Sequence, residues 1–378
     1  MPISIRTVAT LEKPHRQRKL SELVHGLHDT ARAKDAHVHR LDMLKAALQG
    51  AVSLEFSTLP PYLTALWSIR DNRSEVANSI REVLQEEMLH MALACNMLTA
   101  IGGTPEIRTA VPHYPGKLPM DVHPELTVGL SGLNDDVLRA FMEIERPAHP
   151  GHFASLDASR DLEKSETAEH DPEKTDYTIG QFYDALLTTF RETQPAFRAD
   201  RQITGPLAWF VIRDLDDVQR AIATIETQGE GSEGSPDASE GNLSHYFRFA
   251  ELLERKRLEQ DPQTGTWRFR APITFDLSSD VLPVGPAPIG GYDNLTAPDP
   301  EARRLLHRFN STYSEVVDLL DLAWREDGGQ AHLWRGIGLM FDLEKSALPL
   351  MQIARPDGLN YGPDFRYIPP EERFPNQV

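Results

Sequence analysis

The chain has 378 residues, of which 40% are hydrophobic, and a formal net charge of −18. This length suits one large domain or two ordinary ones, and the negative charge argues against nucleic acid and anionic membranes as partners. Apolar runs are short and interrupted by charge, and the first 40 residues lack the apolar segment of a secretory signal, so we expect no membrane span and a cytoplasmic location. The single cysteine, Cys95, lies in an apolar segment and should be buried and inert.

Apolar residues at helical spacing predict an all-α fold. The expected helices cover residues 17–33, 37–70, 75–100, 135–144, 179–193, 215–227, 243–259, 299–325 and 330–353. Pro60 and Pro61 fall inside the second helix and should kink or restart it. Ser74 precedes the third helix and is a candidate N-cap.

Loops rich in glycine, proline or charge separate these helices. They cover residues 106–132, 154–178, 228–241 and 283–298, and a short strand is expected within 267–282. The pattern divides the chain into an N-terminal helical extension (1–40), a helical bundle with long insertions (41–265) and a C-terminal helical pair with a proline-rich tail (266–378), packed on the bundle.

Three polar residues in apolar helices point to a metal. Glu55 shares a helix face with Val52 and Leu59, where an ionised carboxylate is costly unless it is paired or metal-bound. The next helix carries Glu87 and His90, which lie three residues apart and so project from one face. A glutamate facing Glu-x-x-His on the neighbouring helix is half of the ligand set of a dimetal helical bundle. The alternatives are a salt bridge for Glu55 and a hydrogen-bonded core histidine for His90.

The second half of such a ligand set is incomplete. Glu226 ends an apolar helix and is the best single glutamate, and His245 is the best second histidine. Asn242 stands three residues before His245, where the pattern requires glutamate. Glu230 is the first candidate to replace it, although its glycine-rich surroundings could leave it in solvent. Glu145 is the second, with an ion pair to an arginine as its alternative role.

Six blocks of the chain, at 54–63, 86–91, 101–105, 144–147, 226–231 and 245–249, together resemble the ferritin-like domain of iminophenylpyruvate dimer synthases. That family is similar to a domain of violacein- and rebeccamycin-pathway enzymes that couple amino-acid-derived imines oxidatively. The resemblance covers about residues 40–260 and implies a ferritin-like four-helix bundle with long loops, to which the C-terminal helices are additional. It also implies a metal-dependent oxidoreductase of natural-product biosynthesis. The matching metal positions are Glu55, Glu87, His90, Glu226 and His245, together with Glu145 and Glu230.

Carboxylate and imidazole ligands suit a transition metal, with iron the first expectation, mono- or dinuclear, and manganese or copper as alternatives. Such a site would act on a small-molecule substrate with dioxygen or peroxide, in a monomer or small homo-oligomer. Tyr62 and Tyr246 are candidate catalytic residues, in the pocket wall or as one-electron relays, and simple packing is their alternative role. Two other functions stay open: metal storage with ferroxidase activity, and a non-catalytic scaffold with a vestigial site.

Overall fold

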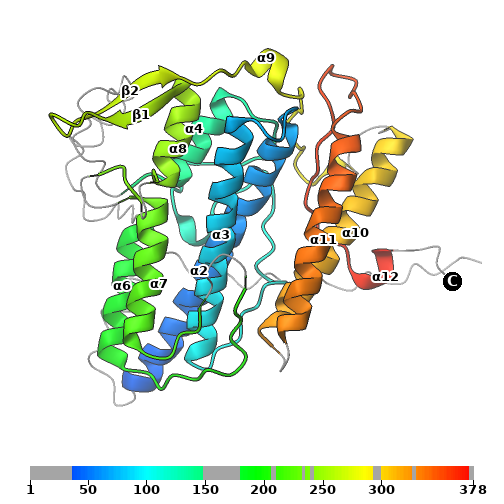
Figure 1. The fold of residues 1–378 in the computed structure, drawn as a ribbon. Helices are drawn as coiled ribbons and strands as arrows, with labels where there is room; N and C mark the ends of the chain where they lie inside the picture. Colours follow the sequence, from blue (N-terminus) through cyan, green and yellow to red (C-terminus); the bar gives the residue numbers. More distant parts are fainter. Residues whose placement is uncertain are drawn as a thin grey trace, which may run out of the picture.

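The computed structural model describes residues 36–147, 179–205, 210–231, 235–238, 242–292, 299–325 and 329–373. The expected helix at 17–33 and the whole of the expected loop at 154–178 lie outside these ranges. The described chain is mostly helical, as predicted, with one small two-stranded sheet. Its helices, shown in Figure 1, are α2 (Ala36–Ser68), α3 (Glu75–Ala100), η2 (Pro119–Asp121), α4 (Asp135–Ile144), α6 (Ile179–Thr193), α7 (Leu215–Gly229), α8 (His245–Glu254), α9 (Leu277–Asp280), α10 (Pro300–Ala323), α11 (Gly329–Leu350) and α12 (Pro370–Arg373).

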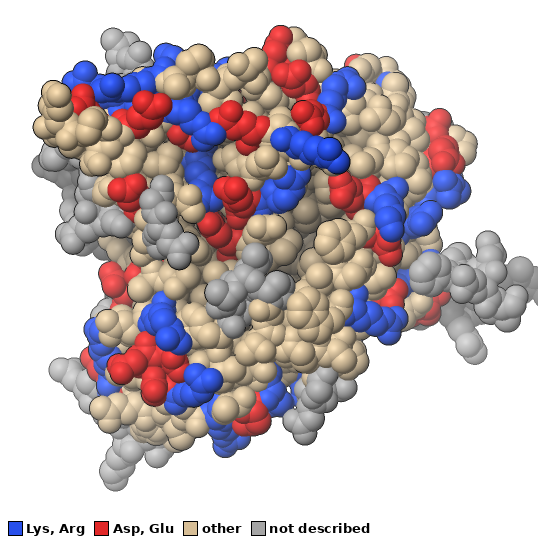
Figure 2. Space-filling model, in the orientation of Figure 1, with Lys and Arg blue, Asp and Glu red and all other residues tan. Residues whose placement is uncertain are grey.

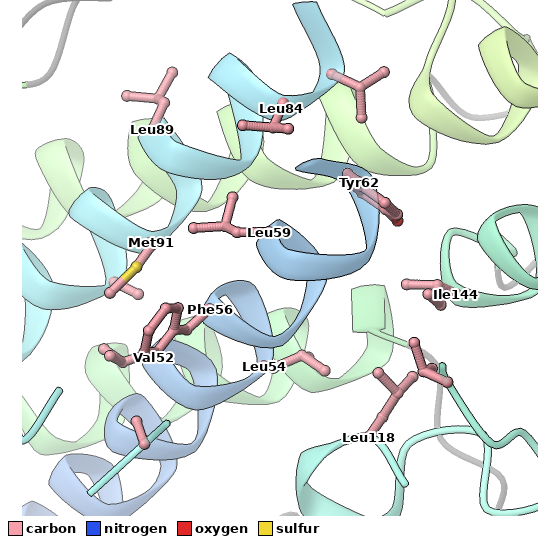
Figure 3. Packing of buried hydrophobic residues seen from close by; sticks show 14 of the residues in the cluster. Val52, Leu54, Phe56, Leu59, Tyr62, Leu84, Leu89, Met91, Leu118 and Ile144 are labelled. Carbon is pink, nitrogen blue, oxygen red and sulfur yellow. The ribbon is translucent and has the colours of Figure 1, made fainter. Parts of the chain in front are cut away.

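Two long helices, α2 and α3, form the centre of the bundle and pack along each other. Apolar side chains from both helices meet in the core, among them Phe56 and Met91 (Figure 3). Ser74 caps α3 by accepting a hydrogen bond from the Ala77 backbone, and Gly102 follows the helix with a φ of +76°, which a glycine adopts without strain.

The sequence predicts a kink or a restart at Pro60 and Pro61, and the structure has one helix, α2, that continues through both without a restart. A proline at position i removes the hydrogen bond to the carbonyl at i−4, so Pro61 leaves the carbonyl of Ser57 free. The Tyr114 hydroxyl donates to this carbonyl at 2.6 Å. A tertiary contact therefore offsets the loss that would otherwise favour a break.

Two short helical pairs cover one side of the long helices and complete the bundle. Helix α4 packs against α8, and α6 packs against α7. The two pairs follow each other along α2 and α3, with α6 and α7 at one end and α4 and α8 at the other (Figure 1). As a result, the ends of α4 and α7 and the beginnings of α6 and α8 all come to the middle of the bundle.

The helix that the sequence predicts at 243–259 extends about one turn beyond the C-terminal end of the observed helix, α8. Helix α8 ends at Glu254 because Arg255 takes the left-handed conformation, with a φ of 52°. Strand β1 (Lys256–Gln260) follows and pairs antiparallel with β2 (Trp267–Pro272), the strand that the sequence predicts. Glu251 accepts a hydrogen bond from the Leu258 backbone at 2.6 Å, which ties the strand to the helix.

Helices α10 and α11 form an antiparallel pair beside α2 (Figure 1), and they match the predicted C-terminal helices. Aromatic residues join this pair to the bundle: Trp67 lies edge-on to Phe309 and parallel to Phe365. On the face shown in Figure 2, acidic and basic side chains are intermingled. Among the described residues, no helix has the length and apolar character needed to cross a membrane.

Candidate metal centre

Five buried polar residues converge where the short helices meet the long pair. Glu55 comes from the middle of α2, Glu87 and His90 from α3, Glu145 from the C-cap of α4 and His245 from the first position of α8. All five side chains belong to residues that are at most 6% exposed. The helix spacing places Glu87 and His90 on one face of α3, as expected from their sequence separation.

These residues form two potential metal-binding groups that share Glu87: Glu55, Glu87 and His90 in one, and Glu87, Glu145 and His245 in the other. In each group the ligand atoms lie within 4.8 Å of one another. Oε1 of Glu87 is 3.6 Å from Nδ1 of His90 and 2.8 Å from Nδ1 of His245. A carboxylate between two histidines is the arrangement that a bridging ligand of two metal ions requires.

Each of the three carboxylates has one oxygen held by a hydroxyl group, while the other faces the histidines. Tyr183 donates to Oε1 of Glu55 at 2.6 Å, and Oε2 of Glu55 is 3.8 Å from Nδ1 of His90. Tyr62 donates to Oε1 of Glu145 at 2.5 Å, and Oε2 of Glu145 is 3.5 Å from Nδ1 of His245.

Glu87 follows the same rule. The Thr58 hydroxyl donates to its Oε2 at 2.7 Å and leaves Oε1 facing both imidazoles. Hydrogen bonds of this kind fix the orientation of ligands before a metal arrives.

Both histidines present Nδ1 to the centre because Nε2 is engaged elsewhere. Nε2 of His90 lies 2.9 Å from Oε1 of Gln228, on α7. Nε2 of His245 lies 2.9 Å from Oε2 of Glu86, on α3. An oxygen partner at Nε2 requires the proton there, which leaves the lone pair of Nδ1 free for a metal.

Crowding of acids in a dry site shifts their protonation. Burial, and then the charge of Glu87, raise the pKa of Glu55 to about 8. Burial and the same charge also raise the pKa of Glu145. For Glu87, burial acts in the same direction, but the close approach of the His245 and His90 imidazoles to its carboxylate outweighs burial and lowers the pKa. Glu87 therefore ionises most readily of the three, and its negative charge disfavours ionisation of Glu55 and Glu145.

The donor set fits a metal ion. Within the described part of the chain, no Lys or Arg forms an ion pair with Glu55, Glu87 or Glu145, so a cation would relieve their mutual repulsion. Nδ1 of His245 is fully buried and makes no hydrogen bond with the described residues. It lies 2.8 Å from Oε1 of Glu87, but the angle between the two groups does not allow a hydrogen bond. Two ligand atoms that both point to one metal ion would have this arrangement.

A small pocket opens onto this centre. Its walls include Glu55, Glu87, His90 and Glu145 of the centre, together with Glu226 and Glu230. The space that a water-sized molecule can occupy in it is about 20 Å³, little more than one water molecule needs. Burial, and then the charges of Asp184 and Glu230, raise the pKa of Glu226 to about 8.

The structure places the predicted site residues at different distances from the centre. Of the two candidates to replace the missing glutamate, Glu145 reaches the second group, whereas Glu230 accepts a hydrogen bond from the Gly180 backbone at 2.7 Å. Glu226 and Glu230 line the pocket and lie in neither group, so metal ligation by them stays a prediction. Tyr62 contacts Glu145, while Tyr246 packs its ring edge-on against Phe247.

Four residues with roles at this site are missing from the sequence analysis. Glu86 and Gln228 hold the histidines, and Thr58 and Tyr183 hold carboxylates. Glu86 had a readable signal, because it is a partly buried acid next to Glu87 in an apolar helix. The sequence offers no comparable signal for Gln228 or Tyr183, whose contacts depend on how α6 and α7 dock.

The model of the ferritin-like family matches residues 48–254 of the 378, and the chain belongs to this family. A ferritin-like protein of known structure from Caulobacter vibrioides is similar to it, with a TM-score of 0.57 and 21% sequence identity. The alignment covers 86% of this chain and 97% of that chain, and at this identity it concerns the fold. No curated protein matches the chain.

Proposed function

We propose that this ferritin-like protein is a metal-dependent oxidoreductase that binds two transition-metal ions, iron first. The observation that supports the proposal is the pair of buried carboxylate and histidine groups that share Glu87. Oxygen and nitrogen donors suit iron, manganese or copper. The family and the cluster together support a dimetal site rather than a single buried ion pair.

The protein's own groups have definable parts in such a reaction. Bound redox-active metal ions would supply electrons to dioxygen or peroxide, and the pocket at Glu55 and His90 admits a molecule of about that size. The Tyr62 hydroxyl donates a hydrogen bond to Oε1 of Glu145, with 2.5 Å between the two oxygens. Burial and the charge of Glu145 raise the pKa of Tyr62 well above its usual value, so this proton is retained at neutral pH. We assign Tyr62 the relay of one proton and one electron from the substrate, which is oxidised, to the site, so that its own phenol is restored in each turnover.

For the substrate, we propose a small amino-acid-derived molecule, such as an imine, in a biosynthetic pathway. The support is the resemblance of six sequence blocks to the ferritin-like domain of iminophenylpyruvate dimer synthases. The pocket has room for about one water-sized molecule, so a substrate of amino-acid size needs side chains such as Glu226 to move. Tyr246 has a contact with Phe247 and none with the clustered ligands, so packing is the role that its surroundings support.

Metal content and oxygen consumption of the purified chain test this function. We expect close to two iron ions per chain and consumption of dioxygen by the reduced protein. Glu87→Ala removes the ligand common to both groups, so metal content should fall close to zero while the far-UV circular dichroism stays helical.

The matched control is Glu192→Ala, at an exposed glutamate of α6, which should keep its metal. A metal-free parent chain, or full metal occupancy in Glu87→Ala, would contradict the proposal. A cage-sized assembly that accumulates iron in excess of two ions per chain would instead indicate storage.

A further inference from the structure

The two histidines of the centre are held by chemically different partners. Nε2 of His245 donates to the Glu86 carboxylate at 2.9 Å, and Nε2 of His90 donates to the Gln228 amide oxygen at the same distance. Glu86 is itself fixed by Arg248, whose Nη2 lies 3.1 Å from Oε1. One histidine therefore has an anionic partner that is held in place, and the other has a neutral one.

This difference changes how strongly each imidazole binds a metal. A hydrogen bond to an ionised acceptor is stronger than one to a neutral amide, and it makes the imidazole a better electron donor at Nδ1. Replacing the outer partner of a metal-bound histidine commonly changes metal affinity by about 10–100-fold. His245 should accordingly hold its ion more tightly than His90.

The two histidines also differ in their access to the pocket. His90 and Glu55 line the pocket, whereas His245 is fully buried and does not. Both groups have carboxylates at the pocket wall, since Glu87 and Glu145 line it too, but only the group of Glu55, Glu87 and His90 also has its histidine there. Its outer partner, Gln228, lies on α7 next to Gly229 and Glu230, which also line the pocket.

From these contacts we infer that the two metal positions are unequal. The position of Glu87, Glu145 and His245, supported by Glu86, retains its ion. The position of Glu55, Glu87 and His90, supported by Gln228, exchanges its ion and binds the external small molecule. Glu86 and Gln228 are positioning residues, and the inference rests on the proposed dimetal function.

Anaerobic titration of the metal-free protein with Co²⁺, followed by its visible absorption and by calorimetry, tests the inequality. We expect two steps, with the second equivalent bound at least about 10-fold more weakly than the first. Azide should change the spectrum more strongly after the second equivalent than after the first, because only the second position has its histidine at the pocket wall.

Substitutions of the positioning residues assign the steps. Glu86→Gln should weaken the first step by about 10–100-fold and Gln228→Glu should strengthen the second, while Glu86→Asp should restore part of the first step. Glu192→Gln is the matched control and should change neither step, because Glu192 is an exposed glutamate of α6. If Glu86 only stabilises the fold, Glu86→Gln should instead weaken both binding steps together.

The outcomes separate this inference from the function on which it rests. If the parent chain binds no Co²⁺, the proposed function fails. If it binds one equivalent only, the dimetal function fails as well. If it binds two equivalents with equal affinity, or if Glu86→Gln and Gln228→Glu leave both steps unchanged, the function survives and the inequality is wrong.

Discussion

At the scale of single residues, the site is organised by a division of labour within each carboxylate. One oxygen of Glu55, Glu87 and Glu145 accepts a hydroxyl hydrogen bond, and the other is left for the centre. The hydroxyl groups are uncharged, so they orient the carboxylates without neutralising their negative charge. The site is thus prepared for a cation by neutral groups, which is the condition for tight binding with little rearrangement.

Removing one of these hydroxyl groups should destabilise the metal-free protein. In Tyr183→Phe the carboxyl group of Glu55 loses its partner at 2.6 Å inside a dry site, at a cost of about 1–3 kcal/mol. Urea unfolding of the metal-free variant measures this cost. Tyr246→Phe is the control, because the Tyr246 hydroxyl makes no hydrogen bond with a described residue, and an equal loss in both variants would contradict the argument.

The stability of the metal-free protein should depend on pH through Glu226. Its pKa of about 8 in the folded chain exceeds the usual 4.5, so the folded state binds this proton more tightly than the unfolded state does. The contribution of Glu226 to stability is therefore fully present below about pH 4.5 and is lost as the pH rises to about 8.

Glu226→Gln removes this dependence. Relative to the parent, the metal-free variant should gain stability between pH 5 and pH 8, by about 1 kcal/mol because solvent screens a partly exposed group. Urea unfolding at both pH values gives the difference. A gain that is equal at pH 5 and pH 8 would show that the carboxyl group titrates normally.

At the scale of helices, the division of the bundle into short pairs explains the missing second motif. A continuous helix would carry glutamate and histidine three residues apart, as α3 does. Here α7 ends at Gly229 and α8 begins at His245, so the glutamate beside His245 comes from the end of α4 instead. At the start of α6 the backbone N–H of Gly180, which has no partner within the helix, donates to Glu230 at the pocket wall.

Two glycines at this junction should respond differently to alanine. A Cβ at Gly180 would lie 2.8 Å from Oε2 of Glu230, so Glu230 must move and lose its hydrogen bond. A Cβ at Gly229 would meet its nearest neighbour at 3.9 Å, which is an ordinary contact.

We therefore expect Gly229→Ala to stabilise the protein by about 0.5–1 kcal/mol. Gly180→Ala should gain about 1 kcal/mol less, which is the contribution of a typical hydrogen bond. Thermal unfolding of both variants measures the difference, and equal gains would mean that Glu230 does not depend on the Gly180 backbone.

At the scale of the whole molecule, the C-terminal pair shares its core with the bundle. Phe309 of α10 and Phe365 of the tail surround Trp67 of α2, and Trp324 donates to Asn96 of α3 at 2.9 Å. Helix α2 therefore has the candidate metal ligand Glu55 on one side and the C-terminal aromatic residues on another. Loss of packing at α10 should therefore displace α2 and, with it, the Glu55 side chain.

Phe309→Ala should lower the free energy of unfolding by about 3–5 kcal/mol, because it opens a cavity in a fully buried aromatic cluster. Far-UV circular dichroism, tryptophan fluorescence and metal release should report a single transition. The control is Phe341→Ala, at a phenylalanine that is 66% exposed, with an expected change within about 0.5 kcal/mol. Separate transitions for bundle and C-terminal pair would show that the two unfold independently.

The amino-acid sequence by itself determined the helical class, most helix positions and the group of Glu55, Glu87 and His90. These features depend on local spacing, since the helical repeat alone puts Glu87 and His90 on one face. The length of α8 was misjudged because a left-handed Arg255 leaves no periodic signal. Only the tertiary structure decided that Glu145 joins His245, and that Glu86 and Gln228 hold the two histidines. These contacts depend on how separate short helices meet beside α3, which no pattern within one segment specifies.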